Sequence, residues 1–583
     1  MGGITNTFDA ADRLTSSKDG KNQTLIYTYD NNDRLTETRQ GATCVAATCV
    51  TYTYDANGNL SQRVDGSGTT TITYDAQNRA TAKTMGGTTT SLTYDGASNI
   101  LTSVDPLGTV TYKYDAANRL ISLAEPGGSC PATPAFPNAT KCTGFDYDAN
   151  NRRTVTKYPN GVKNTTVIDP AGRITSITAT NTSAAVLAKR AYTYTVNGTK
   201  DGALRKTVTD QAGAVTTYTY DEVNRLKQAV TGTLTETWSY DKNGNRTIDT
   251  RTGTGNVYNA YNAADQLCWV GSSAGACASP PSGAIMYAYD ANGNTTTAGT
   301  TTQSYNVFDQ FTTNNVGGTT NYTYTGTRND ERLTAGPTSF LNGALGITRQ
   351  TTSGASTSFI RDPDGALISM RNSAGASFYY TTDALGSIIL LTDSVQAAAA
   401  TYAYDSWGQP TVSTGAQAAV NPWTYAGGYN DTSSNRIKFG ARYYNPYRGR
   451  FTQPDPSGQE QNRYLYAGAN PVNSTDPTGL LSLGEAVGGA IGLIFTSGAI
   501  GLGCAATLGV GCAVGVAVAF GIAGGAVGGL TGKAVAARID GKSRAEVNSA
   551  ALGGFVQGAV SGAIAGASRG VQDQIIDIGS WLK

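Results

Sequence analysis

The chain has 583 residues, with 43 lysines and arginines against 42 aspartates and glutamates, so its formal net charge is +1. A chain without a net positive field lacks the long-range attraction that nucleic-acid binding needs, and we expect no nucleic-acid partner. The sequence contains no histidine. This excludes Ser-His-Asp and Cys-His catalytic sites and histidine metal sites. We therefore expect neither a metal nor a cofactor, and catalysis is left to other polar side chains.

The N-terminus begins Met1-Gly-Gly-Ile-Thr-Asn, without a basic segment followed by an apolar one. We expect no classical secretory signal peptide. Repeat-like sequence starts at once, as it would in the C-terminal part of a longer polypeptide.

A repeat dominates the chain up to about residue 440. Its unit is an aromatic residue, any residue, Tyr-Asp, three further residues, Arg or Asn, and Leu, as in 27–35, 52–60 and 112–120. The aspartate recurs most often after 20 or 21 residues, at positions 9, 30, 55, 75, 95, 115, 148, 169, 221, 241, 290 and 309. Alternating Thr and Tyr is typical of a β-strand, and Asp-x-x-Gly/Asn is typical of a turn. Each unit therefore predicts a β-hairpin, and successive hairpins must pair because a lone hairpin is marginal in water.

These hairpins resemble the YD repeats of RHS proteins, which wind them into a hollow β-shell, or cocoon. The resemblance covers residues 1–480. It implies a mainly β fold in which antiparallel hairpins coil into a shell over residues 1–439. The repeated tyrosines and aspartates would then have packing and turn roles rather than catalytic ones.

The eight cysteines fall in four close pairs. Three pairs lie where an insertion lengthens a hairpin; the step from Asp115 to Asp148, for example, is 33 residues. A short loop closed by a disulfide explains this placement and implies an oxidising destination, with free loop thiols as the alternative. The expected pairs are Cys44 with Cys49, Cys130 with Cys142, Cys268 with Cys277, and Cys504 with Cys512.

A different motif occupies residues 440–480. It reads Arg442-Tyr-Tyr-Asn-Pro446, Gly449-Arg-Phe451, Asp455-Pro-Ser-Gly458, Asn462-Arg-Tyr464-Leu-Tyr466, Asn470-Pro471 and Asp476-Pro-Thr-Gly-Leu480. This resembles the RHS-associated core signature, with some twenty positions in register. The resemblance implies self-cleavage after the second Asp-Pro motif, at the bond between Leu480 and Leu481.

Asp455 and Asp476 are the matching candidate catalytic pair. Two carboxylates can activate water and protonate the leaving amine, as in aspartic proteases, when proximity or burial separates their pKa values. We expect Arg450 to hold one carboxylate ionised and to fix its orientation. The alternative is that both Asp-Pro pairs merely form turns.

The tail, residues 481–583, has a different composition. Residues 486–532 carry no charge for 47 residues, and residues 547–568 carry none for 22. About 20 apolar residues span a bilayer as a helix. Glycines recur every fourth residue, as in close helix packing within membranes, at Gly521, Gly525 and Gly529 and at Gly554, Gly558, Gly562 and Gly566. The pattern predicts a small α-helical, membrane-inserting tail, and it resembles the glycine-zipper segments of some RHS effectors.

The resemblance implies an RHS-type interbacterial effector that is secreted or delivered to a target cell. Its shell would enclose the tail, aspartate-dependent cleavage after Leu480 would free the tail, and the tail would form pores in the target membrane. The implied partners are a cognate immunity protein, the target-cell membrane, and the spike or adaptor of a secretion machine such as a type VI system.

Other functions are compatible with the same residues. The tail could be a translocation segment or an inert apolar domain. The whole chain could instead be a secreted or surface protein that binds carbohydrate on its Tyr-rich β-surface, with the tail as a membrane anchor.

Overall fold

The computed structural model describes residues 3–196, 200–458, 460–480 and 483–484. Its regular structure is almost entirely antiparallel β, which confirms the predicted fold class. Three short 3-10 helices occur in these ranges, η1 (Ala46–Thr48), η2 (Tyr425–Gly427) and η3 (Ala467–Ala469). None of the helices among the described residues has the length and apolarity to cross a bilayer. The glycine rows and the Cys504–Cys512 pair of the predicted helical tail lie outside the described residues.

The strands follow one another closely along the chain. The first group is β1 (Thr5–Phe8), β2 (Leu14–Lys18), β3 (Thr24–Tyr29), β4 (Leu35–Gln40), β5 (Cys49–Tyr54), β6 (Leu60–Asp65), β7 (Gly68–Tyr74), β8 (Ala80–Met85), β9 (Thr88–Tyr94), β10 (Ile100–Asp105), β11 (Gly108–Tyr114), β12 (Leu120–Ala124), β13 (Cys142–Tyr147), β14 (Arg153–Lys157), β15 (Lys163–Ile168), β16 (Ile174–Thr180) and β17 (Val186–Thr193). The second group is β18 (Thr195–Val196), β19 (Lys200–Asp201), β20 (Thr207–Asp210), β21 (Val215–Tyr220), β22 (Leu226–Thr231), β23 (Leu234–Tyr240), β24 (Arg246–Arg251), β25 (Gly255–Tyr261), β26 (Leu267–Gly271), β27 (Ile285–Tyr289), β28 (Thr295–Ala298) and β29 (Thr301–Tyr305). The third group is β30 (Phe311–Asn315), β31 (Thr319–Tyr324), β32 (Arg332–Ala335), β33 (Thr338–Gly343), β34 (Gly346–Thr352), β35 (Ala355–Arg361), β36 (Leu367–Arg371), β37 (Ser377–Thr382), β38 (Ile388–Thr392), β39 (Ala398–Tyr404), β40 (Pro410–Thr414), β41 (Tyr429–Asp431), β42 (Arg436–Phe439), β43 (Arg442–Asn445), β44 (Arg450–Phe451), β45 (Ser474–Thr475) and β46 (Leu483–Gly484).

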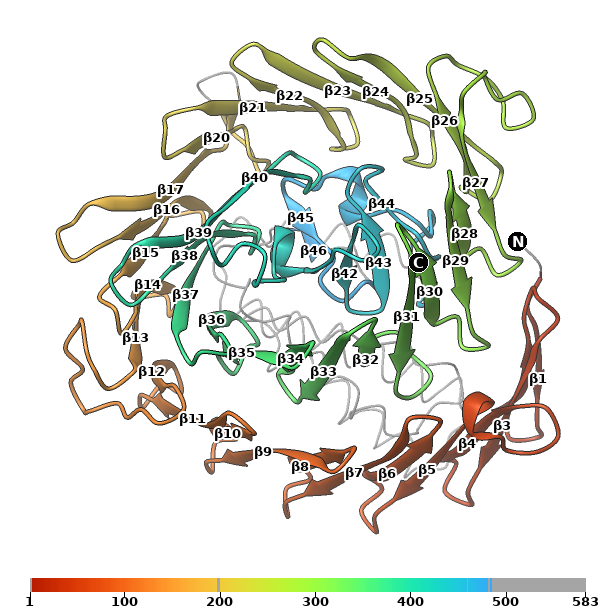
Figure 1. Ribbon diagram of the computed structural model, residues 1–583, viewed down its shortest axis with the longest axis horizontal. Coiled ribbons are helices and arrows are strands. Elements are labelled where there is room, and N and C mark those ends of the chain that lie inside the picture. The colour runs from red at the N-terminus through yellow and green to blue at the C-terminus, as the bar shows by residue number, and fades with distance from the viewer. Residues whose placement is uncertain (1–2, 197–199, 459, 481–482, 485–583) are drawn as a thin grey trace, which may run out of the picture. The chain divides into compact units, whose positions relative to one another are not determined.

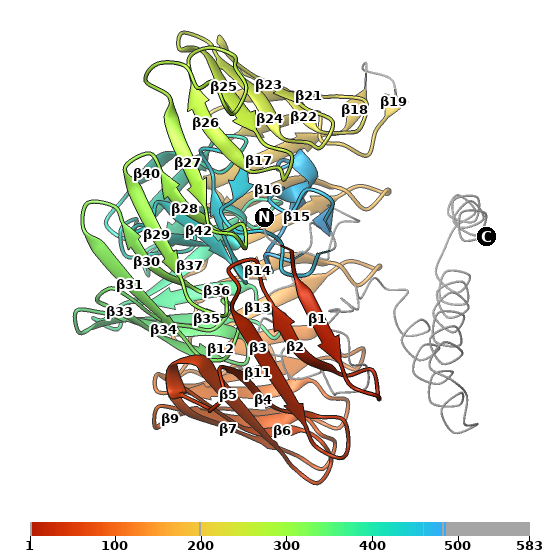
Figure 2. The ribbon, with the colours of Figure 1, turned by 90° about the vertical axis from the view of Figure 1, so that its right-hand side faces the viewer.

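Most of these strands form one continuous meander. In the described part of the chain, 38 of them pair antiparallel, each with the next, from β1 to β17 and from β20 to β40. Figure 2 shows β2, β3 and β4 lying side by side, as their pairing requires. Strands β41–β44 make a separate four-stranded sheet, and β18–β19 and β45–β46 are two-stranded. Within the predicted helical tail, the two described residues thus form the short strand β46 rather than a helix.

The hairpin β3–β4 shows why the repeat folds as it does. The Asp30 side chain accepts backbone N–H groups of Asn32 and Arg34 through Oδ1, at 2.9 and 3.0 Å, and so closes the turn. Its other oxygen, Oδ2, lies 2.7 Å from the guanidinium of Arg34. Asp33 takes a φ of +61°, a value that Asn and Asp tolerate better than most residues. The Tyr-Asp-x-x-x-Arg pattern is therefore a self-contained turn.

The same residues join each repeat to the next. The Arg34 guanidinium stacks on the ring of Tyr54 at 4.8 Å. The Tyr54 hydroxyl in turn donates back to the carbonyl of Leu35 at 2.8 Å. Arg79 with Tyr94 and Arg225 with Tyr240 repeat this stacking. Packing and turn formation thus account for these tyrosines and aspartates, as the sequence predicts.

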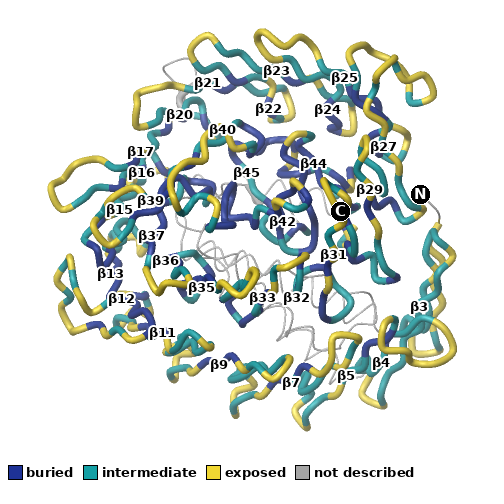
Figure 3. The backbone as a smooth tube through the Cα atoms, viewed as in Figure 1, coloured by how far each residue is buried: buried dark blue, intermediate teal, exposed yellow. Residues whose placement is uncertain are grey.

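Figure 1 shows two layers in the described part of the chain. Strands β1–β29, which we name the wall, follow one another around the outside, and the inner segment, residues 332–480, lies within their curve. Figure 3 shows exposed residues at the hairpin turns of the wall and buried residues concentrated in the inner segment. The largest aromatic clusters bury residues of this inner segment, including Tyr443, Tyr444, Phe451 and Tyr466.

Contacts between residues far apart in sequence attach the inner segment, and Glu331 just before it, to the wall. Arg63 on β6 lies 2.8 Å from Glu331, and Lys83 on β8 pairs with the same carboxylate. This double pairing lowers the pKa of Glu331 to about 2, against the opposing effect of burial. At the other side of the wall, Arg205 donates to the carbonyl of Val472 at 2.6 Å.

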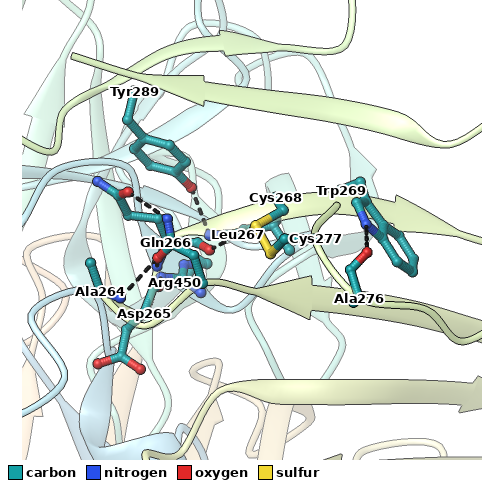
Figure 4. Close-up of a disulfide and its surroundings, with 11 residues drawn as sticks. Ala264, Asp265, Gln266, Leu267, Cys268, Trp269, Ala276, Cys277, Tyr289 and Arg450 are labelled. Atoms are coloured by element: carbon teal, nitrogen blue, oxygen red, sulfur yellow. Dashed lines mark hydrogen bonds between the residues drawn. A yellow bond between two sulfur atoms is a disulfide. The ribbon is translucent and has the colours of Figure 1, made fainter. Parts of the chain in front are cut away.

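The structure joins three of the expected cysteine pairs by disulfides. They are Cys44–Cys49, Cys130–Cys142 and Cys268–Cys277. Figure 4 shows the third of these beside Trp269, whose indole N–H donates to the carbonyl of Ala276 at 3.0 Å. Each disulfide closes an insertion loop of the wall, where the predicted repeat spacing is interrupted.

Candidate self-cleavage site

Asp455 and Asp476 both belong to the inner segment and are both buried. Asp455 follows β44 and is 4% exposed, and Asp476 directly follows β45 and is fully buried. Asp476 contacts Leu480, the residue before the predicted cleavage point, directly, and Asp455 is linked to Leu480 through Ser457. The sequence motif therefore places its two carboxylates around one peptide segment.

Arg442 on β43 is the arginine that pairs with a candidate carboxylate. Its Nη2 lies 2.9 Å from Oδ2 of Asp476. Its other nitrogens donate to the carbonyls of Gly479 and Arg463, at 2.5 and 3.0 Å. The Arg463 carbonyl also accepts the backbone N–H of Asp455, at 2.8 Å. Arg442 thus contacts Asp476, the backbone just before Leu480, and the turn at Arg463 that bonds to Asp455. Such a charge-assisted pair favours the ionised carboxylate.

Arg450, which is expected from the sequence to hold a candidate carboxylate, contacts the wall in the described structure. Its guanidinium stacks between the rings of Tyr261 and Tyr464, at 4.8 Å from each. It donates to the side chain of Asn245 at 3.4 Å and to the backbone carbonyl of Asp265. Figure 4 shows Arg450 beside that wall turn. The role expected of Arg450 falls to Arg442 because β43, and not β44, runs beside the Asp476 loop.

Leu480 is held by groups at both ends of its backbone. Its N–H donates to Oδ1 of Asp476 at 3.1 Å. Its carbonyl oxygen accepts the hydroxyl of Ser457 at 3.1 Å, and the same hydroxyl lies 2.7 Å from Oδ2 of Asp455. The carbonyl of the predicted cleavage bond is therefore contacted from the Asp455 side through Ser457, and the N–H of the preceding peptide bond is contacted by Asp476.

Two glycines allow this segment to approach β42–β43. Gly479 has a φ of +65°, and a Cβ there would lie 2.4 Å from the carbonyl oxygen of Phe439. Gly440, with a φ of +38°, would place a Cβ 2.1 Å from the carbonyl oxygen of Thr478. The backbone contact that this closeness permits is the bond from the Ala441 N–H to Thr478, at 2.8 Å. The glycine of the Asp-Pro-x-Gly-Leu motif is thus a steric requirement.

Aromatic side chains surround the site and exclude solvent. The ring centroids of Tyr444 and Tyr466 are 4.1 Å apart, and Phe451 lies 5.7 Å from Tyr466. Burial raises the pKa of Tyr466 well above its ordinary value, and electrostatic interaction with Tyr444 and Asp476 adds to this effect. Electrostatic interactions are stronger in such a low-polarity site than in water.

Arg442 and Ser457 are the two site residues that the sequence reasoning missed. Both stand inside the motif that located the carboxylates, in Arg442-Tyr-Tyr and in Asp455-Pro-Ser457-Gly. A signal for Arg442 was its place among buried aromatics, where an arginine needs a charged partner. Nothing in the spacing distinguishes Ser457 from an ordinary turn serine. Leu481 lies outside the described residues.

Two family models match the chain. The one described as Teneurin YD-shell matches residues 203–330 and 347–472. The one described as RHS repeat matches residues 8–43, 54–90, 74–110 and 94–129. Together they extend over more than half of the chain, and the second coincides with the hairpins whose turns are closed by Asp30, Asp75, Asp95 and Asp115.

Known proteins share the sequence and the fold. The tRNA3(Ser)-specific nuclease WapA of Bacillus spizizenii is 29% identical over 282 residues, which is 45% of this chain and 12% of the nuclease. A crystal structure of TcdB2-TccC3 has a TM-score of 0.65 at 16% identity, over 82% of this chain and 28% of the other. A structure of the Photorhabdus luminescens Tc holotoxin pore has a TM-score of 0.67 at 15% identity, over 85% and 28%. The chain thus spans about an eighth of the WapA relative and about a quarter of the solved chains. The chain belongs to the RHS/YD-repeat family of β-shell proteins.

Proposed function

We propose that this protein is an RHS-type effector whose β-shell carries a C-terminal tail and releases it by self-cleavage after Leu480. The observation that carries the proposal is that two buried aspartates are linked to the backbone of Leu480, Asp476 directly and Asp455 through Ser457. Asp-Pro turns with no further role do not require a buried carboxylate paired with a buried arginine. A buried charge without a partner lowers the stability of the folded state. A buried carboxylate with its arginine is therefore expected mainly where the pair has a function.

The chemistry is hydrolysis of one peptide bond. Asp476, paired with Arg442, acts as the base: it takes a proton from water as the water oxygen bonds to the Leu480 carbonyl carbon. The carbon–nitrogen bond then breaks, and its electron pair leaves on the nitrogen, which takes up that proton. The products are a carboxyl group at Leu480 and an amino group at residue 481. Asp455 acts as the acid on the carbonyl side, which suits a chain that has no histidine.

We further propose that the released tail acts on membranes and not on RNA, although the WapA relative is named as a tRNA nuclease. Its uncharged runs of 47 and 22 residues and its glycine rows suit helices that insert in a bilayer. A toxin of this kind calls for a cognate immunity protein in the producing cell and for a spike or adaptor of a delivery machine. The toxin-like relatives support both partners in general terms.

Intact-mass spectrometry of the purified chain tests the cleavage. We expect wild type to give two polypeptides that meet between Leu480 and Leu481, and Asp476→Asn to give one uncut chain. Asp75→Asn is a matched control, because Asp75 closes a turn of the wall between β7 and β8 and should leave cleavage intact. A single uncut mass for wild type would refute the self-cleavage.

Membrane activity needs a separate test. Residues 481–583, produced in cells with and without export to the periplasm, should dissipate the membrane potential measured with a voltage-sensitive dye. A version in which Gly554, Gly558, Gly562 and Gly566 are replaced by leucine should lose the effect, because bulky residues prevent close helix packing. Unchanged potential with the original tail would refute the pore and favour an anchor or an inert segment.

A further inference from the structure

We infer that Ser457 is a catalytic residue of the self-cleavage, relaying a proton between Asp455 and the carbonyl oxygen of Leu480. The inference rests on the proposed function and adds a residue to it. The Ser457 hydroxyl lies 2.7 Å from Oδ2 of Asp455 and 3.1 Å from the oxygen of Leu480. It is the side-chain group in the described structure that links a candidate carboxylate to the carbonyl that hydrolysis must attack.

The Ser457 hydroxyl can pass a proton between the Asp455 carboxyl group and the Leu480 carbonyl oxygen. A serine hydroxyl has one proton to donate, and it stands between two oxygens. The Leu480 carbonyl carries no proton and can only accept. In the proposed relay Asp455 carries a proton and donates to Ser457, while Ser457 donates to Leu480. The carboxyl group and the hydroxyl then act in series on the oxygen where negative charge develops.

The local backbone holds the serine in this position. The Ser457 N–H donates to Oδ1 of Asp455 at 2.9 Å, and the Gly458 N–H donates to the Asp455 carbonyl at 3.3 Å. The Asp-Pro-Ser-Gly turn therefore presents the hydroxyl over the carboxylate it follows. Because these bonds do not depend on the cleavage segment, the serine is oriented before the reaction, which is the requirement for stabilising a transition state.

The relay acts in the addition step. As the water oxygen bonds to the Leu480 carbonyl carbon, the π electrons of the carbonyl move to the carbonyl oxygen. That oxygen takes the proton of Ser457, and Ser457 in turn takes the proton of Asp455. When the tetrahedral intermediate collapses, the proton returns by the same path and the carbon–nitrogen electron pair leaves on nitrogen. Asp455 ends protonated as it began, and the water proton held by Asp476 completes the amine, so no external reactant is needed.

A time course of cleavage in the full-length chain, made by cell-free synthesis and followed by intact mass, tests the relay. Ser457→Ala should slow cleavage by about 100-fold, the usual cost of losing one preorganised donor. Ser457→Thr keeps a hydroxyl and should stay within a few-fold of wild type, while Ser457→Cys, a weaker donor, should fall between them. Ser434→Ala is the control, because Ser434 is fully buried and its hydroxyl donates to the carbonyl of Asp431, at 3.3 Å, and not to a candidate site residue in the described contacts.

The outcomes separate the relay from the cleavage itself. If wild type is cut, Asp476→Asn is not, and Ser457→Ala is cut at the wild-type rate, the relay is refuted and the proposed function stands. If Ser457→Ala and Ser457→Thr are equally slow and both lower the unfolding temperature, the serine is only structural and the relay is refuted. If wild type is not cut, the proposed function fails and the relay with it. Rescue by threonine at an unchanged unfolding temperature supports the relay.

Discussion

Two buried arginines of residues 440–480, which we name the junction, have different roles, although they stand only eight positions apart in the sequence. Arg442 stacks on Phe451 at 3.7 Å and pairs with Asp476. Arg450 stacks on Tyr261 and Tyr464 and reaches carbonyl and amide oxygens of the wall. The first belongs to the proposed cleavage site, and the second attaches the junction to the wall.

This difference predicts opposite results for matched substitutions. Arg442→Gln should stop cleavage and lower the free energy of unfolding by about 3–5 kcal/mol, because Asp476 would remain buried without its charge partner. Arg450→Gln should also lower stability but leave cleavage running. Intact mass at fixed times after synthesis, with calorimetry on the same samples, measures both effects. A folded Arg450→Gln chain that stays uncut would contradict the assignment.

The sequence could locate the two aspartates but could not assign the arginine. Asp455 and Asp476 stand in repeated Asp-Pro-x-Gly motifs, so a local pattern marks them. Which arginine meets Asp476 depends on how β42–β44 fold over the loop that carries it, and three arginines stand between residues 442 and 450. That information lies in tertiary packing, and so does the contact of Ser457 with Leu480.

At the scale of the element, the turn between β35 and β36 shows how a wall hairpin pattern is reused inside. Asp362 closes this turn through the N–H groups of Asp364 and Ala366, at 3.1 and 2.8 Å. It also lies 2.7 Å from a guanidinium nitrogen of Arg153 on β14. Asp364 has no such pairing in its favour: burial and the neighbouring charge of Asp362 raise its pKa, against the smaller opposing effect of Arg153.

The raised pKa predicts a pH-dependent stability. Below the ordinary pKa of 3.8, Asp364 is protonated in the folded and unfolded states alike, and its burial does not lower the stability. Between 3.8 and the raised pKa, Asp364 is ionised in the unfolded chain and still protonated in the folded one. The free energy of unfolding therefore falls as the pH rises through this range, by about 1.4 kcal/mol for each unit of the shift. Asp364→Asn should remove this loss, so the gap between the unfolding temperatures of variant and wild type should widen from pH 4 to neutrality.

Asp362→Asn is the matched control in the same turn. It removes the partner of Arg153 and should therefore lower the unfolding temperature at neutral pH, where Asp364→Asn raises it. Calorimetry across the same pH series measures both variants. Parallel curves for Asp364→Asn and wild type would contradict the raised pKa.

Hairpins were predictable because each is encoded locally. Strand alternation, an Asp at the turn and a residue that tolerates positive φ recur within nine residues, and β3–β4 forms as that pattern predicts. The repeat aspartates recognised in the sequence end at Asp309, yet the same turn closes hairpins at Asn372 and Asp393. There the Tyr-Asp signature is lost while the turn chemistry remains, so a search for the tyrosine misses them.

At the scale of the whole molecule, the junction is attached to the wall at several distant points. Asn462 donates to the side chain of Asn245 at 2.8 Å, and the Tyr464 hydroxyl donates to the carbonyl of Gly293 at 2.6 Å. Arg205 reaches Val472 on the same stretch. None of these contacts involves a residue beyond Leu480. Cutting after Leu480 should therefore leave residues 1–480 folded.

This attachment predicts how the cleaved protein behaves. Wild type should give two bands on a denaturing gel, while residues 1–480 keep the unfolding temperature of the uncut Asp476→Asn chain. The cut frees the tail covalently, and size-exclusion chromatography shows whether the shell still binds it: bound fragments elute together and separate only in denaturant. A large fall in the unfolding temperature after cleavage would show that the cut bond itself holds the junction in place.

The arginine–tyrosine contacts between successive hairpins also bear on how such a protein can change in size. Arg34 contacts the next repeat and Tyr54 contacts the previous one, so these two contacts join a hairpin to its neighbours in a way that other hairpins of the wall repeat. Genetic duplication of a whole unit of about 20 residues would supply matching edges on both sides, whereas half a unit would offer two unlike edges. We therefore expect the wall to lengthen or shorten by whole hairpins. Under the proposed function, the size of tail that a shell can hold would then change in steps of one repeat.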